Sequence, residues 1–223
     1  PPIPDTEVRI VDPETNKVLF TVGDKSLEGL AVKGEIWVRG PQVMKGYYKE
    51  PELTAQTIKD GWLRTGDVGM ITHNLCLKIL GRSKATIVLS SGENVEPEPI
   101  EMRLQQSQFI EQCMVVGQDK KFLGTLIVPT LAEFREAGFQ EQSAEELALN
   151  PEARKIIRDE IRRMISVSEG FKRYEHIRDF RILPESFEVG RELTNLHKVK
   201  RHVVHEKFNH VIDDLFSNEI NFQ

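Results

Sequence analysis

Cysteine is scarce in this chain, and long apolar runs are missing. The sequence has two cysteines in 223 residues, Cys76 and Cys113, which argues against a disulfide-stabilised scaffold. Both lie in apolar, strand-like runs, so we expect buried free thiols in a reducing compartment. The best candidate for a membrane span, residues 123–128, is far shorter than the ~20 residues that a transmembrane helix needs.

A large excess of charge of one sign is also missing. The 30 basic and 35 acidic residues leave a net charge of −5, which argues against general nucleic-acid binding. Four histidines gather near the end of the chain, but no cysteine or carboxylate set completes a coordination shell, so we predict no metal site. These histidines are His197, His202, His205 and His210.

What is present is ordinary for a globular protein that buries a core. Apolar residues make up 39% of the chain and charged residues 29%, and 223 residues suffice for one large or two small domains. The first residue is Pro1 rather than Met, so we expect the chain to have been cut from a longer protein.

The first part of the chain has the pattern of short strands. Apolar residues recur in short segments bounded by turn residues, which predicts an antiparallel, β-barrel-like subdomain. These segments are residues 7–11, 18–22, 34–40, 68–71 and 75–80. A short helix is predicted to begin at Pro51, and a three-residue loop to join the last two strands. We interpret Trp37 and Trp62 as packing residues.

The second part mixes strands with helices, which predicts a compact α+β domain. Strands are expected at residues 109–116 and 122–128 and around 180–182. The clearest helix begins at Asn150-Pro151 and is predicted to end at Gly170, with apolar residues at i, i+3 and i+4 spacing. A last helix is expected from about Lys200.

Residues 60–97, between the two parts, carry the most specific motifs. Residues 61–67 read GWLRTGD; residues 81–84 read GRSK and are followed by GENVEP at 92–97 and Ile100-Glu101. In order and spacing these motifs resemble the adenylate-forming superfamily of acyl-CoA synthetases, luciferases and nonribosomal peptide adenylation domains. Residues 40–48, 192–194 and 198–201 are similar to the long-chain fatty acyl-CoA synthetase branch. The resemblance covers nearly the whole chain, but only the C-terminal part of such an enzyme.

The resemblance implies a fold of class α+β and a division of the chain. Residues 1–81 would be the β-rich end of the large N-terminal adenylation domain, residues 82–84 the hinge, and residues 85–223 the mobile C-terminal domain. Lys84 lies at the hinge position, where the superfamily most often has Asp and some branches have Lys. A Gly-Arg-Ser-Lys break is also compatible with an ordinary turn.

The resemblance also implies that four residues near this hinge would bind the nucleotide or CoA. Asp67 and Arg82 match the family residues that contact the ribose hydroxyls of ATP or AMP, although each is also compatible with a local turn role. Gly92 matches the residue that lines the pantetheine tunnel of CoA, where a hydrogen at Cα would leave room for the thiol arm. Glu93 is its neighbour and is assigned to the same tunnel.

Lys198 matches the catalytic lysine that holds the acyl carboxylate and the α-phosphate while the adenylate forms. From the residues alone, a solvated lysine among basic neighbours would be the favoured interpretation, and only the placement of the motif reverses it. The loop departs from the common family pattern at two positions. His197 stands where many members have Gly, and Asn195 stands where many long-chain members have Pro.

The resemblance therefore implies a long-chain fatty acid–CoA ligase that forms acyl-adenylate from fatty acid and ATP and then acyl-CoA. Neither the family's glycine-rich phosphate loop nor its Thr-Glu Mg²⁺ motif occurs in this sequence. The resemblance therefore implies that the rest of the N-terminal domain would hold Mg²⁺ and the phosphates. The fragment alone would then be inactive. Alternatives are a ligase that feeds a carrier protein, or a noncatalytic interaction module. We expect a cytoplasmic protein, and the basic run from Arg154 to Arg178 leaves a peripheral membrane contact open.

Overall fold

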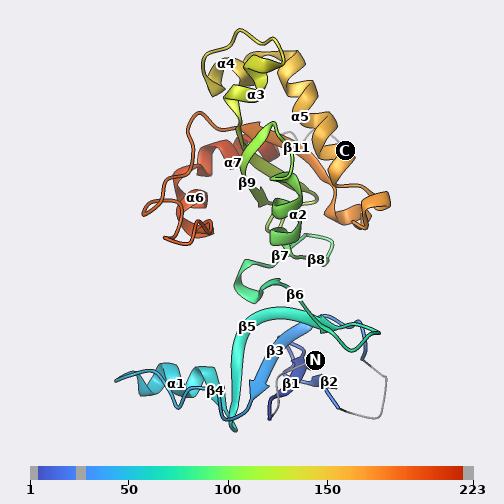
Figure 1. Cartoon of the computed structure of the whole chain (residues 1–223), viewed down its shortest axis with the longest axis vertical. Helices are drawn as coiled ribbons and strands as arrows, with labels where there is room; N and C mark the ends of the chain where they lie inside the picture. Colours follow the sequence, from blue (N-terminus) through green and yellow to red (C-terminus); the bar gives the residue numbers. More distant parts are fainter. Residues whose placement is uncertain (1–4, 24–28, 218–223) are drawn as a thin grey trace. The chain divides into compact units, whose positions relative to one another are not determined.

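The chain folds into two compact units, Pro1–Ala85 and Thr86–Gln223, and each is described by itself (Figure 1). The structure, a computed structural model, describes residues 5–23 and 29–217. We refer to the two as the N-terminal unit and the C-terminal unit. No helix in these ranges is long and apolar enough to cross a membrane.

The N-terminal unit is a curved antiparallel sheet with strand order β2-β1-β3-β5-β4, in which β6 also pairs with β5 (Figure 1). The strands are β1 (Glu7–Val11), β2 (Val18–Thr21), β3 (Gly34–Arg39), β4 (Ile58–Lys59), β5 (Trp62–Ile71) and β6 (Leu77–Arg82). A small core lies on one face, formed by Val8, Ile10, Phe20, Ile36 and Ile71. Helix α1 (Pro51–Thr57) has no fully buried residue, so it adds nothing to this core.

The β5–β6 hairpin differs from the sequence prediction. Strand β5 is ten residues long and runs without a break through Gly66 and Asp67. The connecting loop spans residues 72–76 rather than 72–74, and β6 continues to Arg82 instead of ending at Leu80. The register explains the extension, because Asp67 lies opposite Arg82 and the two side chains form an ion pair across the strands.

The C-terminal unit is built on a three-stranded sheet of order β11-β10-β9. Its strands are β9 (Ile110–Val116), β10 (Leu123–Pro129) and β11 (Ile177–Ile182), and β9 runs antiparallel to β10 while β11 runs parallel to it. A small hairpin of β7 (Ile87–Val88) and β8 (Asn94–Val95) precedes the sheet. Both the α+β class and the two long strands are as predicted.

Helices cover both faces of this sheet, which makes three layers (Figure 1). Alternate residues of β9 point to opposite faces, so Cys113 and Val115 pack with α2 (Pro97–Leu104), α4 (Ala144–Leu149) and α5 (Pro151–Met164). Met114 and Val116 pack instead with α6 (Arg201–Lys207) and α7 (Asn209–Ser217). A further short helix, α3 (Leu131–Glu136), contributes Phe134 to the first of these cores.

Two helix ends differ from the prediction. Helix α5 begins as expected, with the Asn150 side chain accepting hydrogen bonds from the first backbone N–H groups, but it ends at Met164. Gly170, with φ +91°, instead closes a separate 3₁₀ turn at Val167–Glu169. The predicted last helix is interrupted at Phe208, so that α6 and α7 are separate.

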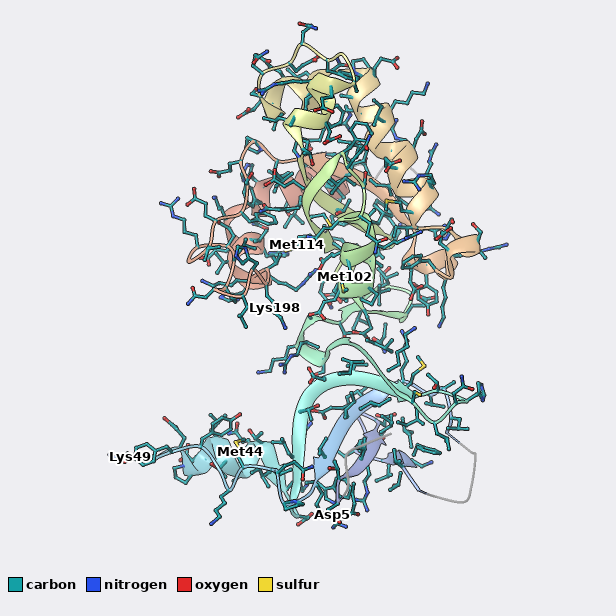
Figure 2. The ribbon with its side chains drawn as sticks, viewed as in Figure 1. Asp5, Met44, Lys49, Met102, Met114 and Lys198 are labelled. Atoms are coloured by element: carbon teal, nitrogen blue, oxygen red, sulfur yellow. The ribbon has the colours of Figure 1, made fainter. Side chains whose placement is uncertain are left out.

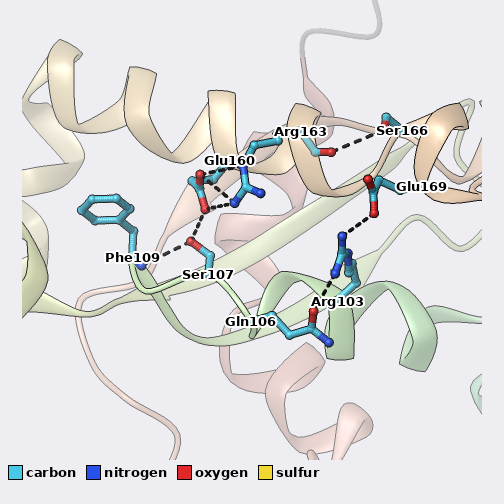
Figure 3. Close-up of polar contacts among 8 residues, drawn as sticks. All are labelled: Arg103, Gln106, Ser107, Phe109, Glu160, Arg163, Ser166 and Glu169. Carbon is cyan, nitrogen blue, oxygen red and sulfur yellow. Dashed lines mark hydrogen bonds and ion pairs between the residues drawn. The ribbon is translucent and has the colours of Figure 1, made fainter.

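Polar contacts join α2 and the loop that follows it to α5 and to the turn after α5 (Figure 3). The Ser107 hydroxyl donates to Glu160 Oε2 at 2.6 Å, and Arg163 Nη2 pairs with the same carboxylate oxygen at 2.9 Å. Arg103 forms an ion pair with Glu169. These contacts fix the position of α2, whose other side faces the site described next.

The two cysteines have different environments. Cys113 is fully buried, and burial raises the pKa of its thiol well above the usual value, as expected for an inert core thiol. Cys76, which was predicted to be buried, is exposed. The reason is that Cys76 lies in the loop before β6 rather than within a strand.

Candidate functional site

Asp67 and Arg82 are brought together by the β5–β6 hairpin. Arg82 Nε lies 2.9 Å from Asp67 Oδ1, and Arg82 Nη1 donates to the Thr65 carbonyl oxygen at 3.0 Å. The side chains remain 30% (Asp67) and 58% (Arg82) exposed, so both stay accessible to a ligand. The pair therefore presents a carboxylate acceptor beside a guanidinium donor, which suits a ligand with vicinal hydroxyl groups.

A buried carboxylate that the sequence reasoning missed supports this pair. Glu35 on β3 is only 4% exposed, and it accepts hydrogen bonds from Trp37 Nε1 at 2.9 Å, Arg64 Nη2 at 3.1 Å and the Gly66 backbone N–H at 3.3 Å. Gly66 has φ +71°, a conformation that favours glycine. The sequence signal that could have identified Glu35 was a charged residue inside the otherwise apolar strand segment at residues 34–38.

The two tryptophans are packing residues, as predicted. Trp62 is 3% exposed and Trp37 is 9% exposed. Trp62 is also covered by cations, because the guanidinium carbons of Arg9 and Arg39 lie 4.0 and 4.7 Å from the centroid of its ring. The tryptophans therefore anchor the sheet that carries Asp67.

Gly92 lies in the loop of the β7–β8 hairpin, in the C-terminal unit. Its φ is +91°, its backbone N–H donates to the Leu89 carbonyl oxygen at 2.8 Å, and a Cβ atom added at this position would meet no other atom within 4 Å. Glu93 follows it, and its carboxylate accepts a hydrogen bond from the Ser91 hydroxyl. The loop is thus an exposed turn closed by a backbone hydrogen bond, with open space directly beside Gly92.

Lys198 lies in a second loop of the C-terminal unit, which we call the lysine loop (residues 194–198; Figure 2). The Thr194 backbone N–H donates to the Lys198 carbonyl oxygen at 2.8 Å, and the Lys198 N–H donates to Thr194 Oγ1 at 3.1 Å. His197 has φ +58°, so it adopts the left-handed conformation that glycine favours. The loop therefore keeps a backbone suited to glycine even though His197 occupies that position.

The base of the lysine loop is held by a second buried carboxylate. Glu192 is 3% exposed, its Oε2 accepts from the Glu188 backbone N–H at 3.0 Å, and its Oε1 accepts from Lys207 Nζ at 2.9 Å. The backbone hydrogen bond, with Lys207 as a further cause, lowers the pKa of Glu192 from 4.5 to about 2. The Glu192 carbonyl oxygen also accepts from the Lys200 N–H at 2.7 Å, which closes the loop.

A pocket of 290 Å³ lies beside the lysine loop. Its lining includes Lys198, Val199 and Arg201 at the end of this loop and the start of α6, and Met102 on α2; Figure 2 labels Lys198 and Met102. Two of its lining residues form an ion pair, in which Arg201 Nη1 lies 2.6 Å from Glu101 Oε1. This ion pair was also missed by the sequence reasoning, because Glu101 and Arg201 are 100 residues apart.

Lys84, the predicted hinge residue, and the four histidines near the chain end are the remaining positions considered from the sequence. Lys84 is exposed in a 3₁₀ turn at Ser83–Ala85, directly after β6, and its hinge role stays a prediction. Among the residues that the structure describes, no group of three or more His, Cys, Asp or Glu side chains is placed to hold a metal ion.

Comparisons with known protein families identify the chain. Residues 84–220 match the AMP-binding enzyme C-terminal domain, and residues 1–48 match the AMP-binding enzyme domain. The chain is 37% identical to long-chain-fatty-acid–[acyl-carrier-protein] ligase AEE15 of Arabidopsis thaliana and 37% identical to long-chain-fatty-acid–CoA ligase 1 of Cavia porcellus. Each alignment covers 97% of this chain but only 28% and 30%, respectively, of the relative's length.

Solved structures give the same result. The adenylation domain of a carboxylate reductase from Mycobacterium chelonae superposes with a TM-score of 0.77 at 25% identity, over 96% of this chain and 31% of that one. The corresponding domain from Segniliparus rugosus, in complex with AMP and a co-purified carboxylic acid, has a TM-score of 0.75 at 25% identity, over 96% of this chain and 32% of that one. The chain therefore belongs to the adenylate-forming superfamily of AMP-binding enzymes, and it corresponds to the C-terminal part of their fold.

Proposed function

We propose that this chain is the C-terminal part of an AMP-forming long-chain fatty acid–CoA ligase. The observation that carries the proposal is similarity to long-chain fatty acid ligases along 97% of the chain, at 37% identity. The substrates would be a fatty acid, ATP and CoA, and Mg²⁺ would bind outside these residues. The reaction would proceed in two half-reactions.

In the first half-reaction, a carboxylate oxygen of the fatty acid attacks the α-phosphorus of ATP, and pyrophosphate leaves. Lys198 would place its ammonium group between the carboxylate and the α-phosphate, because a flexible cationic stem suits both oxyanions. Its side chain is exposed, as this role requires. Asp67 and Arg82 would bind the ribose hydroxyls through the acceptor and donor that they present side by side.

In the second half-reaction, the CoA thiol attacks the acyl carbonyl carbon, the thiol proton is lost and AMP leaves. The C-terminal unit would turn about Lys84 and exchange the lysine loop for the Gly92 loop. The open space at Gly92 supports this step, because a pantetheine arm needs room beside the backbone.

A second acceptor has specific support. The relative from Arabidopsis thaliana is named as a ligase for acyl-carrier-protein, at the same identity as the CoA ligase from Cavia porcellus. CoA and a carrier protein both present a pantetheine thiol, so the same Gly92 loop would serve either. The two acceptors are distinguished by offering each of them to the acyl-adenylate complex of the full-length enzyme.

The proposal is tested on the full-length protein by ATP–pyrophosphate exchange with fatty acids of different chain lengths. We expect exchange that depends on a long-chain fatty acid, and none from the 223-residue chain alone. Lys198→Ala should lower exchange by roughly 10²–10³-fold while leaving the reaction of presynthesised acyl-adenylate with CoA near normal. Absence of exchange in the full-length protein would refute the ligase and favour a noncatalytic interaction module.

A further inference from the structure

Arg201 and Glu101 together occupy the open edge of strand β9. This strand is at the edge of its sheet, so the Val115 backbone N–H and carbonyl groups have no partner strand among the described residues. The N–H donates to Glu101 Oε1 at 2.7 Å, and the carbonyl accepts a hydrogen bond from Arg201 Nη2. Because Arg201 Nη1 also donates to Glu101 Oε1 at 2.6 Å, the two side chains and the backbone of Val115 form a closed ring of hydrogen bonds.

This ring fixes the residue at which α6 begins, three positions after Lys198. Three extended residues span at most ~11 Å, so the Cα of Lys198 cannot move far from that of Arg201. The neighbouring Lys200 N–H donates to the carbonyl oxygen of Glu192, which lies before the lysine loop. Two polar contacts, one at Arg201 and one at Lys200, therefore hold the end of the loop in place.

Packing gives the loop little other support. Asn195, Leu196, His197 and Lys198 are all exposed, and the pocket of 290 Å³ lies beside the loop. A side chain that borders a cavity loses van der Waals contacts on that side. The position of Lys198 should therefore depend on these two polar contacts rather than on a packed surface beneath it.

We propose that Arg201, held by Glu101, is the positioning residue for Lys198 in the adenylation half-reaction. This inference rests on the proposed function. The guanidinium group is required because its planar fork binds the Glu101 carboxylate and the Val115 carbonyl at once, which a lysine ammonium cannot do in the same geometry. The ion pair is largely shielded from water, with 24% of the Arg201 side chain and 11% of the Glu101 side chain exposed.

The test uses full-length Arg201→Lys enzyme. This variant keeps the charge and loses the fork, and a displacement of about 1 Å at a catalytic group can lower the rate by about 100-fold. We expect kcat for pyrophosphate exchange to fall by about 10- to 100-fold, with the KM for ATP little changed. Thioester formation from presynthesised acyl-adenylate should stay near normal. Arg191→Lys is the matched control, because Arg191 pairs with Glu188 on the surface, where both side chains are well exposed.

A double-mutant cycle separates positioning from general structural support. In the Lys198→Ala background, Arg201→Lys should cause no further loss of exchange, because the group that it positions is gone. Equal losses in both half-reactions, or a full additional loss in the Lys198→Ala background, would overturn the inference. So would normal exchange by Arg201→Lys.

A second variant covers the case in which Arg201→Lys fails to fold. Glu101→Gln keeps an oxygen that can accept from Val115 and removes the charge that holds Arg201. It should reproduce the selective loss of exchange, and failure of both variants to yield folded protein would overturn the inference by showing a structural role. A wild-type enzyme without any exchange would instead refute the proposed function itself, so the two failures are distinguishable.

Discussion

Protonation of Glu192 should destabilise the base of the lysine loop. Its carboxylate is almost fully buried and accepts hydrogen bonds from the Glu188 backbone and from Lys207, which lower its pKa from 4.5 to about 2. A folded pKa below the unfolded pKa means that the stabilisation is fully present above the unfolded value. It is then lost as the pH falls from 4.5 towards 2.

The size of the effect follows from this pKa difference. A shift from 4.5 to about 2, at about 1.36 kcal/mol per pKa unit, gives an upper bound of about 3 kcal/mol at neutral pH. Glutamine keeps one acceptor oxygen, so we expect Glu192→Gln to lower the free energy of unfolding by about 1–3 kcal/mol at pH 7. The difference between wild type and variant should shrink as the pH falls from 4.5 to 2.

The two units can be followed separately during urea unfolding of the 223-residue chain. Both tryptophans, Trp37 and Trp62, lie in the N-terminal unit, so their fluorescence reports that unit. Among the described residues, every α-helix except α1 lies in the C-terminal unit. The helical signal in far-UV circular dichroism therefore reports mainly the unfolding of the C-terminal unit. Glu192→Gln should lower the midpoint measured by circular dichroism and leave the fluorescence midpoint unchanged.

Glu188→Gln is the matched control. The Glu188 carboxylate pairs with Arg191 at 3.1 Å, but the two side chains are 62% and 70% exposed, and such surface pairs are worth about 0–1 kcal/mol. The reasoning is refuted if Glu192→Gln is no more destabilising than Glu188→Gln at pH 7. It is also refuted if the difference between wild type and Glu192→Gln is the same at pH 2 as at pH 7.

Three further predictions concern the full-length enzyme. Gly92→Trp should spare pyrophosphate exchange and block thioester formation, because the indole would fill the open space beside the loop; surviving thioester formation would leave Gly92 as a turn residue only. Lys84→Pro fixes a backbone angle and should slow overall turnover more than adenylation, and equal retention of both would argue against a hinge there. Asp67→Asn removes the charge beside Arg82 and should raise the KM for ATP by about 10-fold without changing that for the fatty acid, which steady-state kinetics can check.

The sequence alone determined the elements whose signals are local. Asn150, Pro151 and the apolar spacing that follows them define the start of α5, because a cap and its helix lie within one turn of chain. The apolar runs of β9 and β10 likewise predicted these two strands. The motifs from residue 61 to residue 101 indicate the superfamily by themselves, because their order and spacing can be followed directly along the chain.

Only the tertiary structure decided which polar groups lie together. Strand β6 extends to Arg82 because Asp67 lies opposite it, and that register depends on pairing between strands. Cys76 is exposed because the hairpin loop is longer than the local pattern indicated. The left-handed backbone of His197 likewise shows that the lysine loop retains a conformation suited to glycine.

The buried carboxylates are the clearest case. Glu35, Glu101 and Glu192 are scarcely exposed, although each would be expected at the surface from its residue type alone. Glu101 is buried because its partner Arg201 reaches it from 100 residues further along the chain. A charge leaves water only where a partner is held in place for it, and folding brings Arg201 to Glu101 across this separation, so the local sequence could not reveal that ion pair.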